Sequence, residues 1–231
     1  MKSRFMRLSL WIAWGALAGS VMAEPLVLKA SKDTFGRSNE RTRNSGASPV
    51  LYIAQAPNIR TLVAFDLSGV TNRVLSATLR FRADNTVEEE ISLTVAPMNQ
   101  TPNNAAWKEG AGALGASGQN ARPGESAFGW SAFPEVPWES ASGEPLTGLL
   151  DAALWGTPVV SGKKVSWEKG VWTAVSMENP SLIEKIRNTD HPVITFGIWG
   201  TSGNGLYAIC SRESGSAPEL VLSLEEKEEA P

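Results

Sequence analysis

The segment Leu75-Ser-Ala-Thr-Leu-Arg-Phe-Arg82 decides the fold class, because apolar and polar side chains alternate along its whole length. In an extended strand, every second side chain points to the same face. The pattern therefore predicts a β-strand whose apolar face is buried and whose polar face, which carries Arg80 and Arg82, is in contact with water.

The same period of two recurs along the chain, between short clusters of turn-forming residues. Many short strands separated by Gly, Pro, Asn, Asp and Ser are typical of an all-β sandwich. We expect a jelly-roll β-sandwich of two antiparallel sheets with one or two short connecting helices. The last two strands are expected to form a closing hairpin. Besides 75–82, the expected strands cover 26–30, 50–54, 61–67, 91–95, 172–176, 193–199 and the two strands of that hairpin, 206–213 and 218–224.

Two segments have helical features. Residues 179–188 combine an Asn cap, Pro180 at the first helical position and apolar residues at helical spacing. Residues 146–155 have a weaker pattern, which Gly148 interrupts. Residues 98–143 differ from both, because they are rich in small and polar residues yet contain several aromatic side chains. A loop of that length inside a compact domain is often functional, and its aromatics indicate that it packs on another surface.

The chain begins like a signal peptide. Residues 1–23 combine a basic start, an apolar run and the small or modest side chains Val21-Met22-Ala23 before the expected cleavage point. A single-spanning anchor is the alternative, but the apolar run is too short for a hydrocarbon core of about 30 Å. We expect a secreted or periplasmic protein with one domain over 24–224 and a disordered acidic tail over 225–231.

The composition excludes several partners and sites. The chain has 21 Lys and Arg residues against 24 Asp and Glu residues, and three of the basic residues lie in the expected leader. A mildly acidic surface repels nucleic acids and anionic membranes, so we expect neither as a partner. Cys210 is the single cysteine, so an intrachain disulfide is excluded. Its place in a strand pattern favours a small buried side chain over a reactive thiol.

Five short motifs occur in an order that resembles a known family. Asp33-Thr-Phe comes first, and Asn44-Ser-Gly46 follows. Arg60-Thr-Leu-Val-Ala-Phe-Asp-Leu-Ser68, the strand over 74–81 and the late Ser211-Arg-Glu213 complete the order. It resembles the secreted DNRLRE-type domains, which are classed with carbohydrate-binding module family 96. The resemblance covers residues 29–224, although the name-giving hexapeptide is absent and the usual Val-Thr-Trp element has only a faint echo.

The resemblance implies a jelly-roll sandwich that binds an acidic or neutral polysaccharide. We expect the protein to recognise the polysaccharide without catalysing a reaction. Two other functions stay open. One is a structural or adhesive component of an extracellular or cell-surface assembly, which would contact partner proteins and bind no small ligand. The other, less favoured, is a polysaccharide lyase or hydrolase.

The residues themselves give little support for catalysis. His191 is the only histidine and lies beside a proline, so a solvated turn residue is favoured over a triad member or a metal ligand. One histidine and one cysteine also argue against zinc. Two carboxylates could hydrolyse a glycosidic bond, but ordinary surface acids are favoured. The available carboxylates are Glu109, Glu125, Glu135, Glu139 and Glu213.

Sugar binding needs flat aromatic faces and planar hydrogen-bonding groups. The tryptophans of the long polar region are the candidate aromatic contacts, with packing inside the protein as the alternative. Arginines on neighbouring strands could form a basic stripe for an acidic polysaccharide, with a solvated sheet face as the alternative. The candidate ligand-binding residues are Trp107, Trp130, Trp138, Arg60, Arg80 and Arg82.

Four charged residues are expected to be structural. Arg212 and Glu213 are interpreted as part of a partly buried ion pair with Asp33 or Asp66 that holds strands together, rather than as sugar contacts. Asp33 and Asp66 are expected to accept hydrogen bonds at strand ends rather than to bind calcium. We expect no cofactor, with a structural calcium ion left open, because such sites use scattered oxygen ligands and leave no sequence motif.

Overall fold

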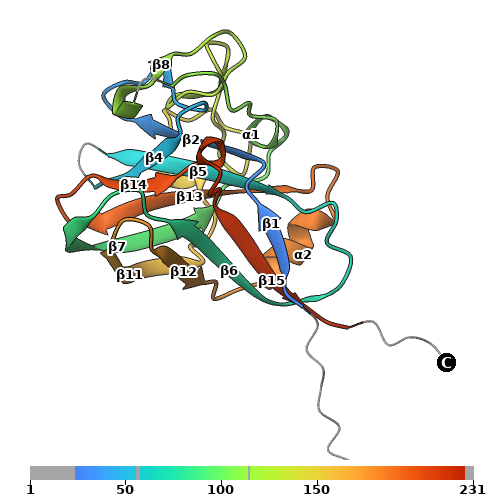
Figure 1. The fold of residues 1–231 in the computed structure, drawn as a ribbon. Coiled ribbons are helices and arrows are strands. Elements are labelled where there is room, and N and C mark those ends of the chain that lie inside the picture. Colours follow the sequence, from blue (N-terminus) through green and yellow to red (C-terminus); the bar gives the residue numbers. More distant parts are fainter. Residues whose placement is uncertain (1–23, 56–57, 114, 227–231) are drawn as a thin grey trace, which may run out of the picture.

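Two antiparallel sheets form the body of the protein (Figure 1). The computed structural model describes residues 24–55, 58–113 and 115–226. The first sheet contains, in spatial order, β1 (Leu26–Lys29), β15 (Glu219–Leu224), β6 (Val74–Arg82) and β12 (Trp172–Ser176). The second contains β11 (Val160–Trp167), β7 (Val87–Pro97), β13 (Val193–Ser202), β5 (Ile59–Asp66) and β2 (Lys32–Arg37).

The strand order is that of a jelly roll. When β2 is left aside and the other eight strands are numbered along the chain, the first sheet has the order 1-8-3-6 and the second the order 2-7-4-5. Strands thus alternate between the two sheets along the chain, except that the consecutive β7 and β11 are neighbours in the second sheet, as two nested Greek keys require. The predicted all-β sandwich is confirmed, and β2 adds a fifth strand at the edge of the second sheet.

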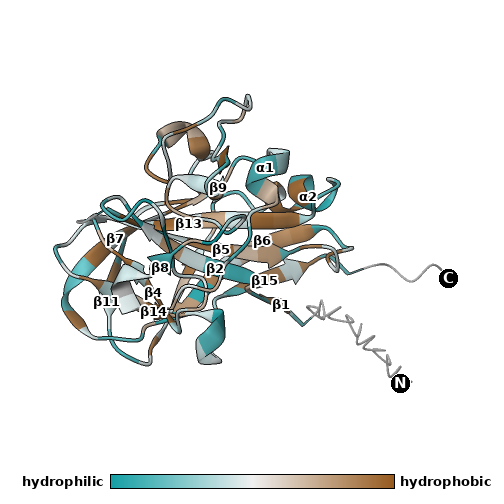
Figure 2. Ribbon diagram, turned by 90° about the horizontal axis from the view of Figure 1, so that it is seen from above, coloured by the Kyte–Doolittle hydropathy of each residue, from teal (hydrophilic) through white to brown (hydrophobic). Residues whose placement is uncertain are grey.

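The main core lies between the two sheets. The inner face of β6 contributes Ala77, Leu79 and Phe81, as the alternation predicts. Leu75 was expected on the same face but is 47% exposed. A register shift near the start of β6, where Val74 pairs with Leu224, interrupts the alternation and turns Val74 inward instead. Seen from above, apolar segments run along the central strands β13 and β6 (Figure 2).

A lobe formed by residues 98–155 covers part of the outer face of the second sheet, and we call it the upper lobe (Figure 1). Its aromatic and aliphatic side chains pack on Leu62 and Ala64 of β5, which forms a second small core. The expected long loop therefore packs, as its aromatics indicated. It contains α1 (Pro102–Ala105), β8 (Gln119–Asn120), β9 (Trp130–Ala132) and β10 (Val136–Pro137), and β8 pairs with β3 (Arg43–Asn44).

The helices differ in part from the prediction. The expected helix at 179–188 is α2 (Ser181–Arg187), but Pro180 is the capping position and Asn179 accepts a hydrogen bond only from the Ser181 hydroxyl. Residues 146–155 contain one short 3-10 turn, Ala152–Leu154, instead of an α-helix. Gly148 there has φ +145°, which an α-helix cannot contain. A further 3-10 turn covers Gly115–Ser117.

The expected closing hairpin is wrong. β14 (Tyr207–Cys210) pairs with β4 (Val50–Ile53), whereas β15 lies between β1 and β6 in another sheet. Residues 211–213 do not extend the strand, because Ser211 caps a 3-10 turn over Arg212–Ser214. Cys210 is buried in β14, as expected.

The two chain ends fall largely outside the described residues. The expected leader at 1–23 lies outside them, as does most of the expected acidic tail. Of that tail, Glu225 donates its amide to the carbonyl of Arg73 and pairs with its guanidinium. Among the helices of the described residues, none has the length and apolar character to cross a membrane.

Candidate functional site

Arg60 and Trp199 lie side by side on the outer face of the second sheet. Thr61 pairs with Ile198 across β5 and β13, so the next position places Arg60 beside Trp199. The Arg60 guanidinium carbon lies 4.8 Å from the centre of the Trp199 ring. On the other side, Trp199 pairs with Thr94 of β7. These residues therefore form a continuous row across three strands.

The upper lobe adds a second indole to this row. The ring centres of Trp155 and Trp199 are 5.5 Å apart and their planes are tilted by 46°. The Trp155 indole N–H donates to the carbonyl of Leu149, and its ring covers Gly197 of β13 so closely that any added Cβ would overlap it. Both indoles remain partly exposed. We call Arg60, Thr94, Trp155 and Trp199 the tryptophan platform.

No carboxylate among the described residues balances the positive charge of Arg60. Within the described segments its side chain forms no ion pair, and its buried Nε has no acceptor. One guanidinium N–H donates to the carbonyl of Ile59 at 3.4 Å. Burial lowers the pKa of Arg60 to about 10, so the group is still charged at neutral pH. An unpaired guanidinium against an indole is suited to an incoming carboxylate.

The expected basic stripe is not assembled. Arg80 and Arg82 lie on the outer face of the first sheet, whereas Arg60 lies on that of the second, because β5 and β6 follow each other in the chain but belong to different sheets. Arg80 pairs with Glu219 and lies 5.3 Å from the exposed Trp172 ring. Arg82 donates to the carbonyl of Gly170. The two arginines therefore already have partners.

Two of the three candidate tryptophans are buried, which contradicts their expected exposure. Trp107 and Trp138 are 1% and 0% exposed, and they belong to the second core. The Trp107 indole donates to the Thr195 hydroxyl at 3.0 Å, and the Trp138 indole donates to the carbonyl of Ala127 at 3.0 Å. Neither ring can stack on a ligand. Trp130 is half-buried and packs edge-on against Phe133.

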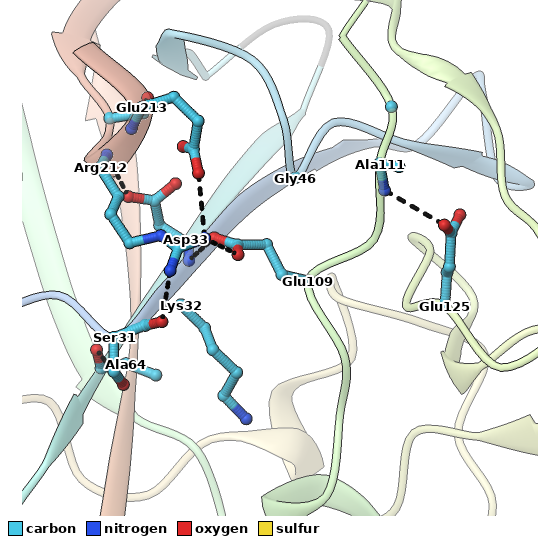
Figure 3. A network of polar contacts seen from close by, with 12 residues as sticks. Ser31, Lys32, Asp33, Gly46, Ala64, Glu109, Ala111, Glu125, Arg212 and Glu213 are labelled. Carbon is cyan, nitrogen blue, oxygen red and sulfur yellow. Dashed lines mark hydrogen bonds and ion pairs between the residues drawn. The ribbon is translucent and has the colours of Figure 1, made fainter.

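A second polar group of residues lies where β2, the segment around residue 109 and the turn after β14 meet (Figure 3). The amide of Arg212 donates to Asp33 Oδ2 at 2.8 Å. Its guanidinium contacts Glu109 Oε2 at 2.6 Å and Glu213 Oε1 at 3.1 Å. The amide of Asp33 donates to Glu109 Oε1 at 2.6 Å. We call Asp33, Glu109 and Glu213 the carboxylate cluster.

The expected ion pair thus has different members. The backbone amide of Arg212 bonds to Asp33, and its side chain forms ion pairs with Glu213 and Glu109. The sequence had indicated Glu109 only as one of several surface acids. Asp66 takes no part in this network. Its side chain is exposed and accepts a hydrogen bond from the amide of Ser68 at 2.9 Å. Asp66 is therefore a strand-end acceptor, as expected, but not a partner of Arg212.

Burial governs the ionisation of the carboxylate cluster. The pKa of Asp33 is raised to about 8, mainly by desolvation, with the charges of Glu213 and Glu109 acting in the same direction and the Arg212 amide opposing them. Desolvation also raises the pKa of Glu109, although the Asp33 amide and Arg212 oppose it. Desolvation lowers the pKa of Lys32, with attraction from Glu109 acting in the opposite direction. Asp33 is the most strongly perturbed carboxylate.

The Asn44-Ser-Gly46 motif positions Glu109. The buried Asn44 amide nitrogen donates to the carbonyls of Glu109 and Ser126, and its oxygen accepts the amides of Gly46 and Gly112. A side chain at position 46 would overlap the carbonyl of Glu109. The segments around residues 44–46 and 109–112 approach each other closely. Gly46 leaves room for this approach, and the Asn44 amide bonds the backbone groups of both segments.

The remaining candidate residues form no catalytic arrangement. His191 is exposed in a turn. Glu125 accepts the amides of Ala111 and Arg122, and Glu139 accepts the side chain of Asn103. A pocket of about 340 Å³ lies elsewhere, between α2 and the segment 156–159, and no carboxylate lines it.

Residues 24–114 match the model of carbohydrate-binding module family 96. The family expected from the sequence is confirmed over this segment. It contains Asp33, Arg60 and Glu109, whereas Trp155, Trp199 and Glu213 lie beyond it. Carbohydrate binding is the function that this family indicates. The search of curated proteins found no match.

Proposed function

We propose that this protein is an exported, non-catalytic carbohydrate-binding protein that holds an acidic polysaccharide on the tryptophan platform. The observation that carries the proposal is the unpaired Arg60 guanidinium against the Trp199 indole. A family 96 match over the segment that contains Arg60 supports the same function.

The chemistry of the platform suits a sugar acid. An indole offers a flat apolar face to the C–H groups of a pyranose ring, and two indoles at an angle can contact successive sugars. A guanidinium can donate two parallel hydrogen bonds to a carboxylate. The Arg80 and Trp172 pair on the opposite face is the weaker candidate, because Glu219 already neutralises Arg80.

The contacts and burial of the three clustered carboxylates support a non-catalytic role. Hydrolysis with two carboxylates requires a protonated acid and an ionised base or nucleophile on either side of an open sugar site. Glu109 and Glu213 contact the same guanidinium, and the third acid beside them, Asp33, is fully buried. A substrate would have to displace Arg212 to reach them.

Affinity electrophoresis of the purified protein tests this function. Gels with alginate or polygalacturonate should retard migration more than gels with neutral dextran or laminarin. Trp199→Ala should abolish the retardation, whereas Trp172→Ala, which removes an exposed indole from the opposite face, should leave it unchanged. Migration that no polysaccharide alters, or equal loss in both variants, would contradict the proposal.

A structural role in an extracellular assembly is the second candidate. Val171 and Trp172 are 48% and 42% exposed at the edge strand β12. An edge strand with apolar side chains can add a strand from a partner chain. Self-association that Trp172→Lys disrupts, in a protein that binds no polysaccharide, would favour this candidate.

A further inference from the structure

The carboxylate cluster brings together oxygen atoms from three distant parts of the chain. One oxygen each from Asp33, Glu109 and Glu213 lie within 4.8 Å of one another. Two oxygens bound to one calcium ion at about 2.4 Å can be separated by up to about 4.8 Å. The spacing therefore allows all three carboxylates to contact a single ion.

A separate observation shows that one carboxylate oxygen of the cluster lacks a hydrogen-bond partner among the described residues. Asp33 is fully buried, and its Oδ1 atom accepts no hydrogen bond from any described residue. The other oxygen, Oδ2, accepts the Arg212 amide. A buried carboxylate oxygen without a donor or a cation is costly, and such atoms in native proteins usually have a proton, a water or an ion beside them.

The nearby cations leave Asp33 uncompensated. The Arg212 guanidinium contacts Glu109 and Glu213 but reaches Asp33 only through the backbone amide. The Lys32 ammonium lies away from the cluster, where it donates to the carbonyl of Trp107 at 2.8 Å (Figure 3). With all three carboxylates ionised, the one adjacent guanidinium leaves two negative charges, which a divalent ion would balance.

We propose that the carboxylate cluster binds a calcium ion, with Asp33 Oδ1 and one carboxylate oxygen each from Glu109 and Glu213 as its protein ligands. All three ligands are hard oxygen donors, and no histidine or cysteine lies among them, which disfavours zinc. The three ligands come from one exposed and two less accessible acids. Calcium tolerates irregular coordination by such a set, whereas magnesium requires near-ideal octahedral geometry. Water completes the coordination on the side of Glu213.

The ion would add a link between three elements that the contacts of Arg212 already bring together. Asp33 belongs to β2, Glu109 to the upper lobe and Glu213 to the 3-10 turn after β14. A ligand that binds only the folded protein shifts the unfolding equilibrium by mass action. Calcium should therefore raise the thermal stability, and this site is separate from the tryptophan platform.

Isothermal titration of chelator-treated protein with calcium chloride tests the proposal. We expect one site per chain with a Kd between about 0.1 and 1 mM, the range of extracellular modules. The melting temperature should rise by several degrees in calcium and fall again with excess chelator. Glu213→Gln, on the exposed turn, should weaken binding at least tenfold while the protein stays folded. Asp66→Asn, which removes an acid outside the cluster, should bind calcium like the unmodified protein.

The titration separates this proposal from carbohydrate binding. No heat of binding and no shift of the melting temperature would overturn it, and Asp33 would then be neutralised by a proton. Undiminished affinity in both Glu213→Gln and Asp33→Asn would also overturn it, because the ion would bind elsewhere. Trp199→Ala should leave the calcium affinity unchanged, so either proposal can fail without the other.

Discussion

The Arg60 guanidinium lies over the Trp199 indole, 4.8 Å from the ring centre, and has no carboxylate partner among the described residues. A cation against an aromatic face gains about 0.5–2 kcal/mol, which holds the guanidinium in one orientation. Packing also restricts the rotamers of both side chains before a ligand arrives. The pair therefore offers a fixed, partly desolvated charge, on which the proposed binding of acidic sugars rests.

Arg60→Lys tests whether the planar guanidinium or only the charge is needed. The lysine variant keeps the charge but loses the two-pronged geometry and most of the stacking on Trp199. We expect the Kd for an acidic oligosaccharide to rise roughly tenfold, about 1.4 kcal/mol, and Arg60→Gln to bind more weakly still. Titration calorimetry at two salt concentrations checks this, because Arg60→Gln should also reduce the salt dependence. Equal affinity in all three proteins would exclude Arg60 as a contact.

Gly197→Ala should damage the platform without changing Arg60, its one charged residue. The added Cβ would overlap the Trp155 ring and push it away from Trp199. We expect a loss of about 1–3 kcal/mol in the free energy of unfolding, together with altered near-ultraviolet circular dichroism and weaker sugar binding. Gly69→Ala is the matched control, since no atom lies within 4 Å of its added Cβ. Unchanged binding by Gly197→Ala would remove Trp155 from the site.

The sequence predicted the sandwich because burial on one face imposes a period of two, as in β6. The same local pattern cannot show which sheet a strand joins. Arg60 and Arg80 lie on consecutive strands, yet they face opposite sides of the molecule because β5 and β6 belong to different sheets. The expected hairpin of the last two strands failed for the same reason.

The site was harder to predict than the fold. Tryptophans in a polar, Gly-rich region appeared exposed, but Trp107 and Trp138 are the core of the upper lobe, and only long-range packing on β5 reveals this. Trp199 carried a usable signal, since it is out of phase with the buried Phe196 and Ile198 on the same strand and so must face outward. Glu109 carried none, because its partners are distant in the sequence.

Asn44→Ala tests the turn that positions Glu109. The substitution removes four hydrogen bonds and leaves buried carbonyls and amides without partners. Each unsatisfied buried group costs about 1–3 kcal/mol, so we expect urea unfolding to show a loss of at least about 3 kcal/mol. Asn103→Ala, which removes an exposed amide bonded to Glu139, serves as the control and should change stability little. A loss no greater than that of the control would mean that the turn does not depend on Asn44.

Trp107→Phe and Trp172→Phe separate packing from surface exposure. Trp107 is buried, and phenylalanine in its place would leave a cavity and deprive the Thr195 hydroxyl of its indole donor. We expect urea unfolding to show a loss of about 2–4 kcal/mol. Trp172 is 42% exposed and lies beside the Arg80 guanidinium at the surface, so its conservative replacement should cost less than about 0.5 kcal/mol. Equal stability of the two variants would contradict the role of Trp107 as the anchor of the upper lobe, because a packed indole cannot lose its ring volume without a measurable cost.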